Sequence, residues 1–259
     1  MQKSQPDKIL IIGTGGLALS FSTALVKCGI YDVYSEGSNS KKTLAFCKKC
    51  KTINFNELEN KSDLIILLAV PDSQIEICAK KYAIFGKLLV HFSGTTPLEI
   101  LTKYLKNGAV CWPLESFSKS KKVNLSKVTC AIGYSNDYSN RILFDLINSI
   151  KAKSILLNNE ERMKLHLTAV MLNNFTYHLF TLIKNWTKNE EIDATLLNGL
   201  FKSTISSFYN DDEGKNQTGP AKRNDQEVIK QHLELLKDYT ALQNIYKVFT
   251  KSIINKYSN

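Results

Sequence analysis

Arginine and long apolar runs are both scarce in this sequence of 259 residues. The longest uninterrupted apolar run covers residues 64–70, whereas a membrane-spanning helix takes about 20 apolar residues. Residues 1–8 are polar and lack the basic-then-apolar pattern of a secretory leader. These absences predict a protein with no membrane segment and favour a cytoplasmic location.

The net charge of +10 comes almost entirely from lysine, because only Arg141, Arg162 and Arg223 are arginines. A strongly basic chain raises nucleic acid as a partner. The lysines are scattered along the chain, which is typical of a solvated surface and not of a specific binding patch. We therefore expect no nucleic-acid site.

The six cysteines are not spaced as a disulfide framework or as a metal site. Cys47 and Cys50 form one CxxC, but no second CxxC and no nearby histidine pair supplies the other two ligands that zinc needs. The pair lies late in a lysine-rich stretch with a helical pattern, whereas a redox pair follows a strand directly. We expect two ordinary thiols on a helix, and no metal.

Strand-like and helical patterns alternate over the first 157 residues. Residues 64–70 are apolar without a break, which is typical of a strand buried on both faces of a parallel sheet. The alternation predicts an α/β fold with a doubly wound, mostly parallel sheet. The expected strands are 8–12, 30–35, 64–70, 87–92, 109–111, 128–133 and 154–157, and the expected helices are 15–27 (ending at Gly29), 41–51, 74–82, 97–105 and 140–150.

From about Asn158 onward the sequence contains only helical patterns. We therefore predict two domains, a sheet domain over 1–157 and an all-helical domain over 158–259. The helical domain is where we expect a second copy to dock and form a homodimer. Its helices are expected over 160–186, 194–209, 227–237 and 239–256, with a polar loop over 210–224.

The turn after the first strand has the sequence Gly13-Thr14-Gly15-Gly16-Leu17-Ala18, which fits GxGxx[GA]. Gly13 permits a tight turn, the bare Gly15 lets a pyrophosphate approach the backbone, and Ala18 lets the helix pack closely on the strand. The helix N-terminus adds free N–H groups and a partial positive charge. At the first strand–helix junction of an α/β chain the motif predicts a dinucleotide site. A glycine-rich turn without a ligand is the alternative.

The end of the second strand, at Ser35 and Glu36, distinguishes NAD from NADP. A carboxylate there accepts hydrogen bonds from the ribose hydroxyls and repels a 2′-phosphate. Lys41 and Lys42 follow and could reverse this preference. The sequence favours NAD and leaves NADP open.

Two further strand ends are expected at the same edge of the sheet, Val70-Pro71-Asp72 and Ser93-Gly94-Thr95. Ligands of open α/β sheets bind outside the carboxyl ends of the strands. We expect both segments to line the nicotinamide half of the cofactor, although each alone would also read as a plain turn.

Three side chains of the helical half are candidates for catalysis. His166 and Asn174 belong to a stripe with a four-residue spacing (166, 170, 174, 178), so they share one side of the predicted helix. An imidazole can supply the proton that a C=O or C=N substrate needs, and an amide can orient the substrate. The guanidinium of Arg223 can bind a carboxylate or phosphate in two places. The alternatives are an internally packed stripe and a capping box of Asn224 and Glu227.

Together these residues resemble the Rossmann-like oxidoreductases related to pyrroline-5-carboxylate reductase and to the deazaflavin-dependent NADP oxidoreductases. The resemblance runs from about residue 9 to residue 257, and it implies an N-terminal dinucleotide-binding domain, a helical C-terminal domain that often dimerises, and a small-molecule substrate. It rests on the glycine motif and on VYS (33–35), HFSG (91–94), PLESFS (113–118), HLTAV (166–170), NF (174–175) and TGPAKRND (218–225), of which the last is the most specific.

The chain departs from that family at three places. Glu36 stands where NADP-preferring members often have arginine, Trp112 where many have histidine or tyrosine, and Glu115-Ser116 where Gln-Thr is more usual. The leading hypothesis is an NAD(P)-dependent oxidoreductase that transfers a hydride to or from a small imine or oxo/hydroxy substrate in an interdomain cleft. The alternative is a non-catalytic dinucleotide-binding sensor or scaffold.

Overall fold

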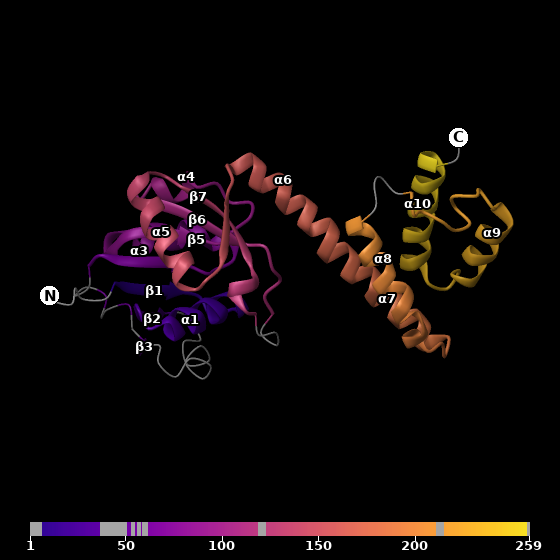
Figure 1. Ribbon diagram of the computed structural model, residues 1–259, viewed down its shortest axis with the longest axis horizontal. Helices are drawn as coiled ribbons and strands as arrows, with labels where there is room; N and C mark the ends of the chain where they lie inside the picture. The colour runs from indigo at the N-terminus through magenta and orange to yellow at the C-terminus, as the bar shows by residue number, and fades with distance from the viewer. Residues whose placement is uncertain are drawn as a thin grey trace. The chain divides into compact units, whose positions relative to one another are not determined.

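The structure is a computed structural model that describes residues 7–36, 51–52, 55, 58, 62–118, 123–210 and 215–257. The chain divides into two compact units, one ending at Ala169 and the other beginning at Val170. The first unit carries a sheet, and the described part of the second is helical (Figure 1). The division therefore falls later than the boundary expected at 157, because the helix that follows the last strand belongs to the sheet unit.

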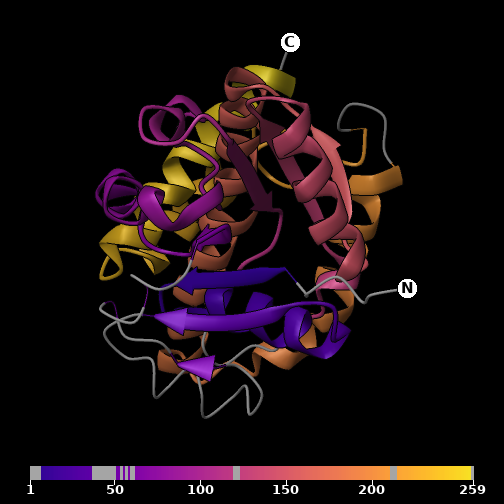
Figure 2. The ribbon, with the colours of Figure 1, turned by 90° about the vertical axis from the view of Figure 1, so that its left-hand side faces the viewer.

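The described part of the first unit contains an eight-stranded sheet in the order β3-β2-β1-β4-β5-β6-β7-β8. Figure 2 shows β1, β2 and β3 side by side at one edge. Neighbouring strands are parallel except β6 and β7, an antiparallel pair that the sequence did not predict. The doubly wound, mostly parallel sheet is thus confirmed. Its strands are β1 (Lys8–Ile12), β2 (Asp32–Glu36), β3 (Lys51–Thr52), β4 (Leu64–Leu68), β5 (Gly86–His91), β6 (Gly108–Pro113), β7 (Thr129–Tyr134) and β8 (Lys153–Leu156).

The strand order reverses at β1. The chain passes from β1 to β2 on one side and later returns to β4 on the other, so that Ile12 pairs with both Glu36 and Leu68. The carboxyl ends of three strands therefore meet at one edge of the sheet. In open α/β sheets this switch point is where ligands bind.

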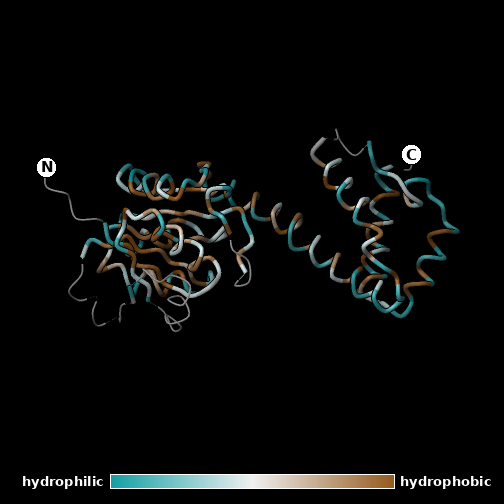
Figure 3. Tube along the Cα trace, turned by 60° about the horizontal axis from the view of Figure 1, so that its bottom comes forward, coloured by the Kyte–Doolittle hydropathy of each residue, from teal (hydrophilic) through white to brown (hydrophobic). Residues whose placement is uncertain are grey.

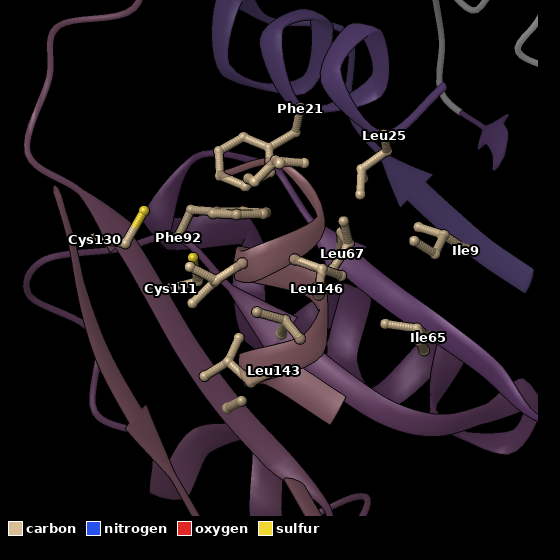
Figure 4. Packing of buried hydrophobic residues seen from close by; sticks show 14 of the residues in the cluster. Ile9, Phe21, Leu25, Ile65, Leu67, Phe92, Cys111, Cys130, Leu143 and Leu146 are labelled. Atoms are coloured by element: carbon tan, nitrogen blue, oxygen red, sulfur yellow. The ribbon is translucent and has the colours of Figure 1, made fainter. Parts of the chain in front are cut away.

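Each face of the sheet packs against its own helices, because alternate residues of a strand point to opposite sides. Ile9 and Ile11 pack on one face with Phe21 and Leu25 of α1 (Gly16–Cys28). Figure 4 shows this core together with Leu143 and Leu146 of α5 (Asp137–Ser149). On the opposite face, Leu10 and Ile12 pack with residues of α3 (Asp72–Tyr82) and α4 (Glu99–Thr102).

All five residues of β4 are buried, as the unbroken apolar run predicted. The tube in Figure 3 shows apolar residues concentrated along the strands of this unit. The predicted stop of α1 is also confirmed, since Gly29 has φ +73° and its N–H donates to the Val26 carbonyl at 3.2 Å. Two short 3-10 turns, η2 (Ala83–Phe85) and η3 (Leu125–Lys127), precede β5 and β7.

The helix predicted over 160–186 consists of three segments: α6 (Asn159–Ala169), a π-helical turn η4 (Val170–Phe175) and α7 (Thr176–Asn189). A π-turn advances by a smaller angle per residue, so the stripe of His166, Asn174 and His178 is not one continuous α-helical face. The stripe is also divided between the units, because His166 belongs to the first and Asn174 to the second.

The remaining helices of the second unit are η5 (Ala194–Leu197), α8 (Asn198–Asn210), α9 (Gln226–Leu235) and α10 (Thr240–Tyr257). The helix expected over 41–51 lies outside the described residues, as do Cys47 and Cys50, except that Lys51 belongs to β3. None of the helices that the structure describes is both long and apolar enough to cross a membrane.

Candidate functional site

The turn between β1 and α1 requires glycine at position 13. Gly13 has φ +116°, and a Cβ added there would lie 2.1 Å from the Ala69 carbonyl oxygen. Its N–H donates to the Glu36 carbonyl at 3.2 Å, and the Ala69 N–H donates to the Ile12 carbonyl at 2.9 Å. The turn therefore lies directly against the segment after β4, and any side chain would force the two backbones apart.

The N-terminus of α1 is open at Gly15. A Cβ at Gly15 would meet no atom within 4 Å. The helix has no side-chain cap and no acidic residue in its first turn, and the Leu19 N–H donates to the Gly15 carbonyl at 3.0 Å. The N–H groups of Gly16 and Leu17 thus have no partner within the helix, and because both residues are partly exposed these groups are available to an anion. Thr14 and Leu17 are half-buried, whereas Ala18 is fully buried in the core.

Gly16 has a further role that sequence reasoning missed. A Cβ at this position would lie 2.8 Å from the Ser118 carbonyl oxygen. The backbone at Phe117 and Ser118 therefore packs on the glycine turn. No local sequence pattern predicts this contact, because the two segments are about 100 residues apart in the sequence.

Glu36 ends β2 beside the glycine turn, as predicted. Its Oε2 accepts a 2.6 Å hydrogen bond from the Tyr82 hydroxyl of α3. Burial and the adjacent carboxylate raise the pKa of Tyr82 far above its ordinary value, so this phenol remains a donor. Ser35, in contrast, is fully buried, and its Oγ has no hydrogen-bond partner in the described part of the chain. Its predicted cofactor role stays a prediction.

The loops after β4 and β5 meet, as predicted. Val70 is half-buried and the exposed Pro71 precedes α3, whose first residue is Asp72. Asp72 Oδ2 accepts hydrogen bonds from Ser93 Oγ (2.8 Å) and Thr95 Oγ1 (2.7 Å).

Ser93 also organises its own loop. Its Oγ accepts hydrogen bonds from the N–H groups of Thr95 (3.0 Å) and Thr96 (2.9 Å). The strand end at Ser93 and Gly94 is therefore a rigid turn fastened to the N-terminus of α3.

A buried histidine supports this turn from inside. His91 is 0% exposed, and its Nδ1 accepts a 3.1 Å hydrogen bond from the Ser93 N–H. Burial, and to a smaller extent the nearby positive charge of Arg162, lower the pKa of His91 to about 3, so the ring is neutral at pH 7. An accepting Nδ1 places the ring proton on Nε2.

Arg162 of α6 fastens the other end of the same loop. Its Nη2 donates to the Thr96 carbonyl at 2.7 Å and to Asn159 Oδ1 at 3.0 Å. Sequence reasoning assigned no role to Arg162, although its scarcity as an arginine and its position one helical turn before His166 were available signals.

His166 lies against the Ser93–Gly94 turn. A Cβ at Gly94 would be 2.6 Å from His166 Cδ2 and 2.8 Å from Trp112 Cε2. The rings of His166 and Trp112 have centroids 5.4 Å apart and an interplanar angle of 49°. Gly94 therefore has to be glycine for β5, β6 and α6 to converge. The half-buried His166 joins the predicted nicotinamide loops within one unit.

Asn174 and Arg223 both belong to the second unit and are exposed. Asn174 Oδ1 accepts a 3.4 Å hydrogen bond from Asn173 Nδ2 within η4. The backbone N–H of Arg223 donates to the Gly219 carbonyl at 3.4 Å. The helix after Arg223 is capped by Asp225, which accepts from the Val228 N–H at 3.3 Å, so the capping residue is not Asn224 as expected.

Among the described residues, no group of three or more histidine, cysteine or acidic side chains is arranged to hold a metal ion.

Comparison with known proteins gives the same architecture. Residues 128–253 match the family model of a domain of unknown function, DUF2520. No curated protein matches the sequence. A proposed NADP oxidoreductase from Bacteroides fragilis is similar in structure, with a TM-score of 0.85, 24% identity, and coverage of 96% of this chain and 98% of that one.

Two solved structures with bound cofactor are more distant. The imine reductase from Myxococcus stipitatus in complex with NADP+ has a TM-score of 0.64 at 10% identity, covering 97% of this chain and all of that one. The pyrroline carboxylate reductase from Plasmodium falciparum with NADP bound has a TM-score of 0.58 at 14% identity, covering 96% and 98%. At these identities the likeness concerns the fold, and it confirms the resemblance at that level: the chain has the Rossmann-like fold with a helical C-terminal unit that these oxidoreductases share.

Proposed function

We propose that this chain is an NAD(P)-dependent oxidoreductase that binds its dinucleotide at the turn between β1 and α1. The observation that carries the proposal is the open, uncapped N-terminus of α1, where Gly15 leaves space above free N–H groups. A pyrophosphate fits this geometry because it supplies negative charge and acceptors to a helix N-terminus. The cofactors bound in two of the similar structures, NADP and NADP+, support the same class of ligand.

Glu36 would face the adenosine ribose of the cofactor. With Tyr82 donating to one oxygen, the carboxylate is held at the end of β2 and retains a second oxygen for a ribose hydroxyl. A fixed negative charge at this place disfavours a 2′-phosphate. We infer a preference for NAD over NADP, even though the cofactor-bound similar structures contain NADP.

The reaction that the site supports is hydride transfer with a small imine or oxo/hydroxy substrate. A bound nicotinamide supplies or accepts the hydride, while the protein supplies position and charge. The turn of Ser93 and Gly94 would hold the nicotinamide ribose. His166 lies on this turn and would donate a proton to the substrate nitrogen or oxygen in reduction, or accept it in oxidation. Asn174 and Arg223 remain proposed substrate ligands, for an amide or hydroxyl and for a carboxylate.

The first test is a coenzyme titration followed by tryptophan fluorescence. Gly15 has φ −78° and open space around it, so Gly15→Ala should fold normally and yet place a methyl group where the pyrophosphate would lie. We expect NADH to bind the wild type and to bind the variant at least about tenfold more weakly, a loss of about 1.4 kcal/mol. Gly199→Ala is the matched control, because a Cβ there also meets nothing within 4 Å. Equal affinity of both variants and the wild type would refute the site.

The second test is a screen of small imines and oxo acids for oxidation of the bound coenzyme. If the wild type oxidises the coenzyme with one of these substrates and Gly15→Ala does not, the result supports the proposal that the chain is an enzyme. Coenzyme binding without turnover over the whole screen would favour the alternative, a non-catalytic sensor or scaffold. That alternative rests on the absence, among the described site residues, of a strongly acidic or basic group with an evident catalytic role.

We also propose that the second unit mediates a homodimer. Several of its large apolar side chains are exposed, among them Leu200 (65%), Phe208 (63%) and Val248 (65%). Soluble monomers rarely leave so much apolar surface to water, and a second copy of the same helices would cover it. Light scattering after size exclusion should give twice the chain mass, and a monomer at micromolar concentration would contradict the proposal.

A further inference from the structure

The imidazole of His166 has no hydrogen bond that fixes its orientation. Neither ring nitrogen has a partner in the part of the chain that the structure describes, and neither is fully buried. A histidine that transfers protons is usually held through one nitrogen, which fixes the tautomer and the direction of the other. In His166 both nitrogens are available to a ligand, so packing decides where they point.

The backbone of α6 near His166 is fixed by hydrogen bonds to the loop after β5. One helical turn before His166, Arg162 Nη2 donates to the Thr96 carbonyl at 2.7 Å. At the start of the same helix, Asn159 Oδ1 accepts a 3.3 Å hydrogen bond from the Leu98 N–H. These bonds hold α6 against the loop, so the direction of the His166 ring is what remains to be set.

Packing against Trp112 sets this direction. The centroids of the Trp112 and His166 rings are 5.4 Å apart, with an interplanar angle of 49°. Gly94 packs on both rings, because a Cβ there would lie 2.6 Å from His166 Cδ2 and 2.8 Å from Trp112 Cε2. The indole itself is carried by β6, in register with Ala131 of β7. The imidazole therefore packs on a strand-borne indole and on the backbone of a rigid turn.

The exposure of Trp112 differs from that of its neighbours. The other residues of β6 are buried, whereas Trp112 is half-buried. Cys111 belongs to the core on one face of the sheet, so the next residue, Trp112, points to the opposite face. A large flat ring that stays partly accessible at the carboxyl end of a strand is typical of the wall of a ligand site. The ring can thus hold His166 and still face a bound ligand.

We propose that Trp112 is the positioning residue of His166, whose imidazole it holds on the Gly94 turn with one free nitrogen directed at the substrate. This inference rests on the proposed oxidoreductase function. In reduction the substrate carbon accepts the hydride of the reduced nicotinamide, while its nitrogen or oxygen accepts the His166 proton, which water then replaces. An aromatic contact restricts the imidazole without occupying either nitrogen. A proton donor held in this way needs no reorientation during the reaction.

The first test is the nuclear magnetic resonance spectrum of the histidine rings in the full-length protein, which needs neither coenzyme nor substrate. The chain has four histidines, so the His166 signal is the one that disappears in His166→Gln. The ring current of the indole should displace this signal in the wild type. Trp112→Leu should remove the displacement, and Trp112→Phe should keep part of it. An identical His166 signal in the wild type and in Trp112→Leu would overturn the proposal.

The second test is the single-turnover rate of hydride transfer, with a substrate on which the wild type is active. Trp112→Leu should slow this step by about tenfold or more, because a small misplacement of a reacting group is costly. The affinity for NADH, followed by the fluorescence of the coenzyme, should stay within about twofold. Trp112→Phe keeps a flat ring but lacks the indole N–H, and its rate should return to within about threefold of the wild type.

Two further variants complete the design. Phe144→Leu is the matched control, because Phe144 is a 50% exposed aromatic residue of α5, which packs on the other face of the sheet. It should change neither the His166 signal nor the rate. Trp112→Met is a second non-aromatic variant whose flexible side chain fills the space of the indole, and it replaces Trp112→Leu if circular dichroism shows that the latter does not fold.

The two tests fail in different ways. Equal rates in the wild type and in Trp112→Leu, or a Trp112→Phe variant that is as slow as Trp112→Leu, would overturn the positioning role. A wild type without turnover would count against the proposed function instead, and the His166 signal would then decide by itself whether Trp112 positions the ring.

Discussion

The Tyr82 hydroxyl donates a 2.6 Å hydrogen bond to Oε2 of Glu36, joining α3 to the carboxyl end of β2. The two residues are 46 positions apart in the sequence. The bond holds the carboxylate at the edge of the sheet where β1 and β2 end together. The hydrogen bond from Tyr82 therefore fixes the position of the Glu36 carboxylate beside the glycine turn. An acidic residue at position 36 without this bond would not be held in one place.

Glu36→Gln should change coenzyme choice. Removing the negative charge should raise the affinity for NADPH about tenfold relative to NADH, corresponding to about 1.4 kcal/mol of relieved repulsion. Dissociation constants for both coenzymes, measured side by side in the wild type and the variant, give this ratio directly. An unchanged ratio would mean that Glu36 does not face the ribose. Tyr82→Phe is the companion variant, and it should weaken NADH binding while keeping the preference for it.

Gly13→Ala should destabilise the protein by about 2–6 kcal/mol, since it combines a strained backbone angle with overpacking. The physical reason is the 2.1 Å approach of the new Cβ to the Ala69 carbonyl oxygen. Chemical unfolding monitored by circular dichroism measures the loss. Gly15→Ala is the control, with an expected change within about 1 kcal/mol. Similar stability of the two variants would contradict the close packing of the turn on the segment after β4.

His91 should make the protein sensitive to mild acid. Its pKa is about 3 in the folded state because of burial, against about 6.5 in an unfolded chain. The unfolded state therefore binds an extra proton as the pH falls below 6.5. The free energy of unfolding should therefore decrease by about 1.4 kcal/mol for each pH unit between pH 6.5 and pH 3. Above pH 6.5 the stability that His91 contributes as a neutral ring is fully retained.

The check on His91 is urea unfolding at pH 7, 6 and 5 for the wild type and His91→Gln. The variant lacks this titrating group and should show a smaller loss between pH 7 and 5. Parallel pH dependence of the two proteins would show that His91 is not held neutral.

His166→Gln should slow hydride transfer without weakening coenzyme binding. The variant keeps a polar side chain near Trp112 and Gly94 but cannot exchange a proton as imidazole does. Hydride transfer should slow by about a hundredfold or more, the usual contribution of a general acid, while NADH affinity should remain within about twofold. Single-turnover absorbance of the reduced nicotinamide measures the first quantity and fluorescence titration the second. Full activity in the variant would assign the proton to another group or to water.

Much of the first unit could be read from local sequence. The glycine turn, the unbroken apolar β4 and the stop at Gly29 each depend on backbone geometry or burial that a few neighbouring residues determine. The positions of Glu36 and Asp72 followed from the rule that parallel strands present their carboxyl ends to one edge. The π-turn η4 was not predicted, because an inserted wide turn leaves the apolar spacing of a helix almost unchanged.

The sequence alone therefore determined the class of fold, the open helix N-terminus at Gly15 and the strand ends around it, since these follow from local periodicity and from single glycines. Only the tertiary structure decided which side chains act on one another. Tyr82 reaches Glu36, Arg162 holds the loop at Thr96, and Gly94 lets His166 approach Trp112, all through contacts between residues distant in the chain. Such contacts depend on how helices and strands pack in three dimensions, and no local pattern encodes that packing.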